Sequence, residues 1–186
     1  MSLGIIAGII SALAFVPYCI SILKGKTKPN RASWWIWFWL GILAYFSYKA
    51  SGAHDTLWVA LVYVITPFIT AMLSLKYGEG GWNKFDLACL GCSIVGSLVW
   101  FISSSPLIAL LLFLSIDLFG ALPTLKKTYY HPETENSLAW FLMAVGNLVN
   151  VFAAEQLKFS ILVYPLYMLI VGGLILGLSL RKARIT

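Results

Sequence analysis

The sequence predicts an all-α integral membrane protein with seven transmembrane helices. Apolar residues make up 60% of its 186 residues and charged residues only 11%. A soluble domain carries roughly a quarter charged residues, so the composition excludes a soluble globular protein. The apolar residues also gather into runs close to the roughly 20 residues that cross a bilayer. The lysines and arginines fall almost entirely between alternate runs.

Seven apolar runs account for nearly the whole chain. The run 87–116 is divided at Ser103-Ser104-Ser105-Pro106, because proline disfavours helical geometry in the residue before it. The run after this break holds a single charge, Asp117. The predicted helices, in chain order, are 1–23, 32–48, 56–75, 87–102, 107–125, 136–154 and 159–180.

The positive charges predict the topology. With seven spans, eleven of the 13 Lys and Arg residues lie on one side, and only Lys49 and Lys158 lie on the other. Cytoplasmic loops carry the excess of positive charge, so we expect the N-terminus outside and the C-terminus in the cytoplasm. This asymmetry explains the net charge of +6 without nucleic-acid binding. We therefore expect a multi-pass protein of the plasma membrane or bacterial inner membrane.

The prolines indicate an internal repeat. Six of the seven prolines form pairs at similar separations, and two serines follow the same spacing. The pairs are Pro17 and Pro123 (106 residues apart), Pro29 and Pro132 (103), Ser33 and Ser137 (104), and Pro67 and Pro165 (98). Two three-helix repeats are therefore expected at 1–76 and 106–186, the second with a short cytoplasmic tail. The linker and fourth helix at 77–105 make the two bundles parallel, a 3+1+3 arrangement.

Pro17-Tyr18 and Pro123-Thr124 are each followed by a lysine-containing loop and a helix that begins near a serine and a tryptophan. These features resemble the PQ-loop superfamily of seven-helix transporters, which includes SWEET-like (MtN3/saliva-type) sugar facilitators and lysosomal amino-acid exporters. The resemblance implies a small-solute transporter that works by alternating access. Tyr18 and Thr124 stand where the family has glutamine, and the third and seventh helices lack the paired asparagines of SWEET-like members. The substrate class, whether sugar, amino acid or vitamin, stays open.

Asp117 lies about midway along the fifth predicted helix. An ionised carboxylate there costs about 2.5–3.5 kcal/mol, so we expect it to face a partner or a water-filled cavity. Asp117 would then carry protons and couple transport to a pH gradient. The alternative is a protonated side chain that hydrogen-bonds a neighbouring helix. At the repeat spacing of 106 the counterpart of Asp117 is Ser11.

Substrate contacts are expected on the sixth helix, where Trp140, Met143, Asn147 and Asn150 share one face. The two amides could hydrogen-bond a small polar solute while the aromatic ring stacks against it. Alternatively, the amides hydrogen-bond neighbouring helices. The third and seventh helices add further substrate-binding candidates: Tyr63, Thr66, Tyr164 and Tyr167.

Four prolines are candidate hinges because a proline inside a helix removes a backbone hydrogen bond and bends the helix. They are Pro17, Pro67, Pro123 and Pro165. Matched bends in both repeats would let the two halves rock about a central site, as alternating access requires. Static kinks are the alternative.

The sequence contains no catalytic triad, nucleotide fingerprint or set of metal ligands, since His54 and His131 are expected on opposite sides of the membrane. We therefore expect no enzyme activity, metal or cofactor. The expected partners are a small-molecule substrate and the lipid bilayer, and homo-oligomerisation stays open. Two other functions are considered: a vitamin facilitator of the nicotinamide riboside type, and a membrane receptor or assembly subunit that binds a lipid or another membrane protein.

Overall fold

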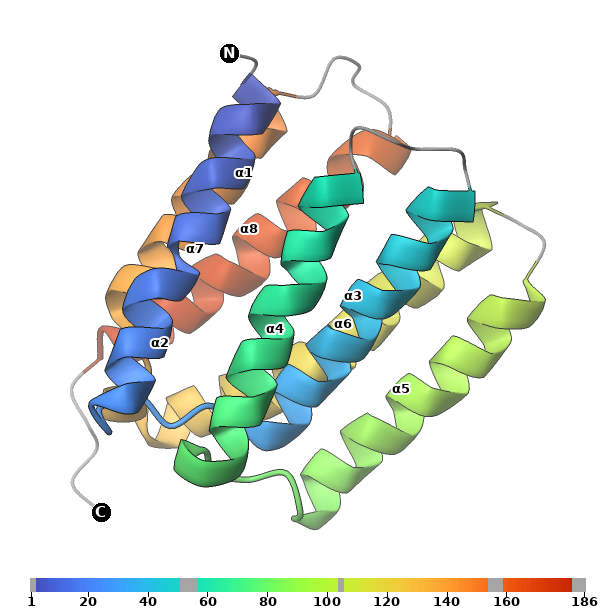
Figure 1. Ribbon diagram of the computed structural model, residues 1–186. Helices are drawn as coiled ribbons and strands as arrows, with labels where there is room; N and C mark the ends of the chain where they lie inside the picture. Colours follow the sequence, from blue (N-terminus) through green and yellow to red (C-terminus); the bar gives the residue numbers. More distant parts are fainter. Residues whose placement is uncertain (1–2, 51–56, 104–105, 154–158, 182–186) are drawn as a thin grey trace. The chain divides into compact units, whose positions relative to one another are not determined.

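The computed structural model describes residues 3–50, 57–103, 106–153 and 159–181 (Figure 1). These residues are almost entirely helical, which confirms the all-α prediction. The elements, in chain order, are α1 (Leu3–Leu13), α2 (Phe15–Leu23), α3 (Arg31–Ala50), α4 (Leu57–Tyr77), α5 (Lys84–Ile102), α6 (Pro106–Tyr130), the short 3-10 helix η1 (Pro132–Thr134), α7 (Ser137–Phe152) and α8 (Phe159–Ser179).

Four helical stretches in the described part of the chain are long and apolar enough to cross a membrane. They are Leu3–Leu23, Lys84–Ile102, Ile108–Tyr130 and Leu162–Ser179. Val64–Tyr77 and Ser137–Phe152 are apolar but shorter. This pattern is consistent with a membrane protein, whereas the count of seven spans, their 3+1+3 arrangement and their orientation stay predictions.

The surface of α5 has the polarity expected of a helix that faces lipid. Its buried residues are Asp86, Cys89, Ser93 and Ser97, which lie three or four residues apart on one face. The side chains of Ile94 and Leu98, by contrast, are 60% and 62% exposed. A soluble helix buries its apolar face, so this reversed pattern suits a bilayer, where small and polar residues mediate contacts between helices.

Pro17 explains why the first apolar stretch is divided into α1 and α2. A proline has no N–H group, so it cannot donate to the carbonyl four residues earlier, here that of Leu13. The break falls directly after Leu13, at Ala14, whose φ of −59° and ψ of −29° are still helical. The interruption is therefore one missing hydrogen bond. Pro67, Pro123 and Pro165 likewise lie inside α4, α6 and α8.

The chain forms two compact units, which combine segments from both expected repeats. The first unit contains Met1–Lys28 and Leu125–Thr186, and the second contains Pro29–Thr124. Thus α1, α2, the last turn of α6, η1, α7 and α8 belong to the first unit, and α3, α4, α5 and the rest of α6 belong to the second.

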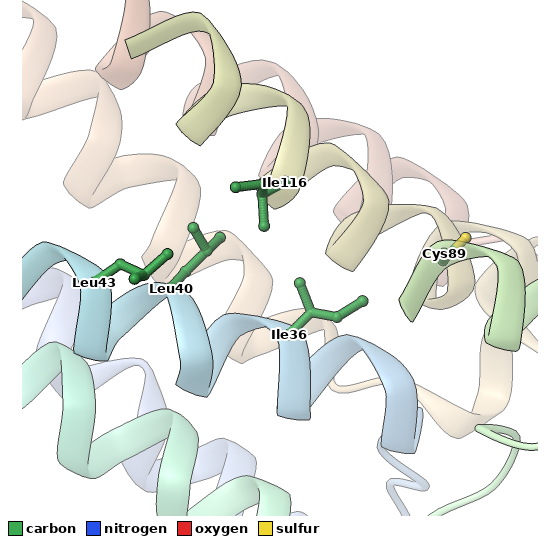
Figure 2. Close-up of a cluster of buried hydrophobic side chains, with 5 residues drawn as sticks. All are labelled: Ile36, Leu40, Leu43, Cys89 and Ile116. Atoms are coloured by element: carbon green, nitrogen blue, oxygen red, sulfur yellow. The ribbon is translucent and has the colours of Figure 1, made fainter. Parts of the chain in front are cut away.

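An apolar core joins α3, α5 and α6 in the second unit (Figure 2). Ile116 of α6 and Leu40 of α3 point toward each other in this core. Gly120 brings α6 close to α3, because a Cβ atom there would lie 3.0 Å from Cγ2 of Ile36. Close approach at small residues lets helices gain dispersion contacts in a bilayer, where transfer from water supplies no driving force between them.

In the first unit, α7 packs closely on α1 and on α8. A Cβ atom at Gly146 of α7 would lie 3.1 Å from the backbone nitrogen of Ser11 and 3.2 Å from the carbonyl oxygen of Ala7, both in α1. The hydroxyl groups of Ser137 in α7 and Ser179 in α8 are 3.0 Å apart. Small residues thus mediate both contacts, as is typical of membrane helices.

Candidate functional site

A buried ion pair lies at the end of α6 in the first unit. Nζ of Lys127 is 2.5 Å from Oε1 of Glu135, and the two side chains are 5% and 0% exposed. Lys127 is in the last turn of α6, and Glu135 directly follows η1. Removing two charges from water costs several kcal/mol for each ion. Only close pairing together with further hydrogen bonds offsets such a cost.

The Lys127 ammonium group has three hydrogens and three acceptors. Besides Glu135, it donates to the carbonyl oxygens of Lys28 at 2.6 Å and Thr134 at 3.3 Å. Lys28 also donates its backbone N–H to the Thr134 carbonyl. The lysine therefore ties the loop after α2 to the loop after α6.

The Glu135 carboxylate accepts two further hydrogen bonds. The Tyr18 hydroxyl donates to Oε1 at 3.3 Å, and Nε1 of Trp140 donates to Oε2 at 2.8 Å. The Tyr18 and Trp140 rings meet edge to face, with centroids 6.3 Å apart. We call these residues together with Lys28, Lys127 and Thr134 the Lys127–Glu135 cluster.

Sequence reasoning did not identify the Lys127–Glu135 cluster. From sequence, Lys127 counts only as one of the basic residues that predict the topology, and Glu135 is not a predicted site residue. The available signal was weak: a lysine just beyond a predicted span, and an acidic residue immediately before the next helix. Trp140 was expected to contact substrate, and its indole N–H is bonded to Glu135. Its role toward a substrate stays a prediction.

A second buried carboxylate, Asp86, lies at the start of α5 in the second unit. Its side chain is held by three N–H groups that all donate to Oδ2: the Gly81 backbone (2.5 Å), Nδ2 of Asn83 (2.8 Å) and Nδ2 of Asn30 (3.3 Å). Asp86 also donates its own backbone N–H to Oδ1 of Asn83, the N-cap of α5. All three of these donors are neutral.

The connection between α4 and α5 is shaped to present these donors. Gly80 and Gly81 have φ values of +69° and +92°, which residues with a Cβ atom rarely adopt. Arg31 fastens the connection to α3: its backbone N–H donates to the Glu79 carbonyl, and its Nη1 atom donates to the Gly80 carbonyl, each at 3.1 Å.

The residues that follow Pro17 and Pro123 each contact the second helix of the other expected repeat. Thr124 donates to Oγ of Ser33 in α3 through its backbone N–H (3.1 Å) and its hydroxyl (2.8 Å). Tyr18 contacts Trp140 of α7 through its ring. The contact between Thr124 and Ser33 lies within the second unit, and the contact between Tyr18 and Trp140 lies within the first unit.

An asparagine caps the second helix of each expected repeat. Oδ1 of Asn30 accepts the backbone N–H of Ser33 at the start of α3, and Oδ1 of Asn136 accepts that of Ala139 at the start of α7. The two asparagines are 106 residues apart, the same separation as Pro17 and Pro123. Asn83 caps α5, which lies outside the repeats, in the same way, so the caps agree with a separation of 106 at this point, and the proline and serine spacings of 103 and 104 stay predictions.

Asp117 and its repeat counterpart Ser11 are both buried. Asp117 is 6% exposed on α6, and Ser11 is 4% exposed on α1. Ser11 lies beside Gly146 of α7. Both positions thus face the interior of their own unit, as expected for polar residues that do not meet lipid.

The other predicted substrate residues lie in several elements of both units. Asn147 is buried on α7, and its Nδ2 atom donates to the Met143 carbonyl one turn earlier at 2.9 Å. Four candidates are half-buried: Asn150, Thr66, Tyr164 and Tyr167. The side chain of Tyr63 lies outside the described residues.

Within the described residues, no group of three or more His, Cys, Asp or Glu side chains is placed to hold a metal ion. No family model, curated protein or solved structure matches this chain. The resemblance to the PQ-loop superfamily therefore rests on the residues of the chain itself.

Proposed function

We propose that this protein is a small-solute membrane transporter that works by alternating access. The observation that carries the proposal is that Asn30 and Asn136, 106 residues apart like Pro17 and Pro123, cap α3 and α7 in the same way. Parallel three-helix repeats are one of the architectures from which alternating-access transporters are built. The shared separation of 106 residues for Pro17 and Pro123 and for Asn30 and Asn136 supports this reading.

In the proposed mechanism, the two units are the bodies that move. Each unit combines the first helix of one repeat with the second and third helices of the other. The chain passes between units after Lys28 and again after Thr124. Alternating access requires two bodies that rock about hinges, and we assign the hinges to these two passages. Pro123 favours bending at the second, because it removes one backbone hydrogen bond from α6.

Asp117 is the proposed proton carrier. Its burial on α6 supports this role, because acidic residues inside membrane-spanning segments are rare and often mark proton pathways. Proton coupling predicts that a pH gradient drives solute accumulation. A purely facilitative carrier would only equilibrate the solute.

The first experiment identifies a solute by thermal stability. Purified protein is heated with glucose, leucine or nicotinamide riboside, because a ligand that binds only the folded state raises Tm by mass action. Stabilisation by nicotinamide riboside alone would favour the vitamin facilitator. Stabilisation by none of the three, together with absent uptake of all three in proteoliposomes, would contradict the transporter proposal and favour a receptor or assembly subunit.

The second experiment tests Asp117. Proteoliposomes with and without a pH gradient take up the stabilising solute, and wild type is compared with Asp117→Asn. We expect the variant to lose gradient-driven accumulation and keep downhill exchange. Glu133→Gln is the matched control, because it removes a carboxylate that is exposed and pairs with His131. Equal accumulation in wild type and Asp117→Asn would refute proton coupling through this residue.

A further inference from the structure

The chain first passes from one unit to the other between Lys28 and Pro29, and each of these residues is bonded within its own unit. In the first unit, Lys28 donates its backbone N–H to the Thr134 carbonyl at 2.9 Å, and its carbonyl accepts a hydrogen bond from Nζ of Lys127 at 2.6 Å. In the second unit, the Pro29 carbonyl accepts the backbone N–H of Glu79 at 3.1 Å. Consecutive residues are thus fastened to different units.

These bonds leave one soft backbone torsion at the first passage. Peptide groups are planar, so only φ and ψ turn freely. The Lys28 carbonyl belongs to the peptide group before the Pro29 ring, and the Pro29 carbonyl belongs to the peptide group after it. The pyrrolidine ring fixes φ near −65°. A turn of the chain at this passage is therefore limited to ψ of Pro29.

The second passage lies in α6, close to Lys127. Thr124, the last residue of the second unit, bonds Oγ of Ser33 through its backbone N–H and its hydroxyl. Lys127 lies three residues further along the same helix, in the first unit, and bonds the Lys28 carbonyl. The helix lacks one backbone hydrogen bond here, because Pro123 has no N–H. The Lys127 side chain therefore connects the first passage to the second.

We propose that Lys127 joins the two passages into one pivot, in which ψ of Pro29 is the soft torsion of the first passage. The Lys127 ammonium group holds the peptide group between Lys28 and Pro29 in the first unit, and Glu135 balances its charge. Without that bond, φ and ψ of Lys28 would also turn, because only the N–H of Lys28 would stay fixed to Thr134. This inference rests on the proposed rocking of the two units and names the residues that confine it.

Distances between two spin labels, measured by pulsed electron paramagnetic resonance, test the pivot in the full chain without any solute. The labels are attached to Ile9→Cys in the first unit and Ile94→Cys in the second, at positions whose side chains are 46% and 60% exposed. The three native cysteines, Cys19, Cys89 and Cys92, are first replaced by serine. The width of the distance distribution then reports how freely the two labelled units turn.

Pro29→Ala should widen the distance distribution, because alanine frees φ and keeps the carbonyl that accepts from Glu79. We expect the width to rise about 1.4-fold, since two soft torsions replace one and their variances add. Pro132→Ala is the matched control, because that proline is also fully buried but lies within the first unit. A width that Pro29→Ala leaves unchanged, or that Pro132→Ala raises equally, would overturn the pivot.

A second variant keeps the test decisive if Pro29→Ala fails to fold. Lys127→Met/Glu135→Gln removes the bond to the Lys28 carbonyl and leaves no buried charge in its place, so it should also widen the distribution. Lys126→Met is the control, because that lysine is exposed. An unchanged width in the double variant would refute the role of Lys127. Failure of the transporter proposal has a separate signature, the absence of uptake by wild type, which these widths do not measure.

Discussion

Two of the buried carboxylates, Glu135 in the first unit and Asp86 in the second, are stabilised by different chemistry. Glu135 in the first unit pairs with the Lys127 ammonium group. Asp86 in the second unit accepts three N–H groups, and no described lysine or arginine forms an ion pair with it. Both acids lie beside an asparagine that caps a helix, since Glu135 precedes Asn136 and Asp86 bonds Asn30. The two carboxylates therefore find their partners in two ways, through a cation at Glu135 and through neutral N–H donors at Asp86.

The difference has an energetic consequence. An ion pair leaves an opposite charge buried when either partner is removed, and that charge has no water to solvate it. Neutral donors leave only unpaired N–H groups when the acid is removed, which costs less. The first unit should therefore be the more sensitive to substitution at its carboxylate cluster.

Lys127→Met should give the largest loss of stability. The substitution leaves the Glu135 carboxylate buried without a cation, and we expect the free energy of unfolding to fall by about 3–5 kcal/mol. Denaturant titration in detergent measures the change. The double variant Lys127→Met/Glu135→Gln should recover part of the loss, because no charge remains. Lys126→Met is the control, since that lysine is exposed; an equal loss in the control would contradict the role of the pair.

Asp86→Asn should give a smaller loss, of about 1–3 kcal/mol, in the same titration. An amide in place of the carboxylate presents either an oxygen of lower charge or an NH₂ group to the donors of Gly81, Asn83 and Asn30. Glu133→Gln should have little effect, because its side chain is 54% exposed. A larger loss for Asp86→Asn than for Lys127→Met would reverse the comparison between the units.

Asn30 and Asn136, which cap α3 and α7, should give smaller effects, each within about 0.5–2 kcal/mol on replacement by alanine. Asn30→Ala should cost more than Asn136→Ala. Asn30 also donates to the buried Asp86, whereas the second contact of Asn136 is to the Pro17 carbonyl at 3.4 Å. Tm of the two variants, measured side by side, checks the order, and a greater loss at Asn136 would count against it.

Apolar runs predicted the helices well but missed their charged ends. The predicted spans 32–48 and 159–180 correspond closely to α3 and α8. The span predicted to end at 125 continues to Tyr130, and α5 begins at Lys84 rather than 87. Both errors have one cause: charged residues were taken to lie outside helices, whereas Lys127 and Asp86 are buried inside them.

The charged partners could not be found from local sequence. Tyr18 and Glu135 are 117 residues apart, and Asn30 and Asp86 are 56 apart. Hydrophobic periodicity reports which face of a helix is apolar and says nothing about which loop the chain brings to that face. The position of Asp117 within an apolar run can be read from local sequence, whereas its expected role toward protons stays a prediction.

The division of the chain also sets the order in which it can assemble during synthesis. Residues 29–124 contain all of the second unit, so this unit can pack while the ribosome is still translating. Residues 1–28 are made before this unit, yet they pack with residues 125–186, which are made after it. Helices α1 and α2 therefore stay without their packing partners until residues 125–186 have been synthesised.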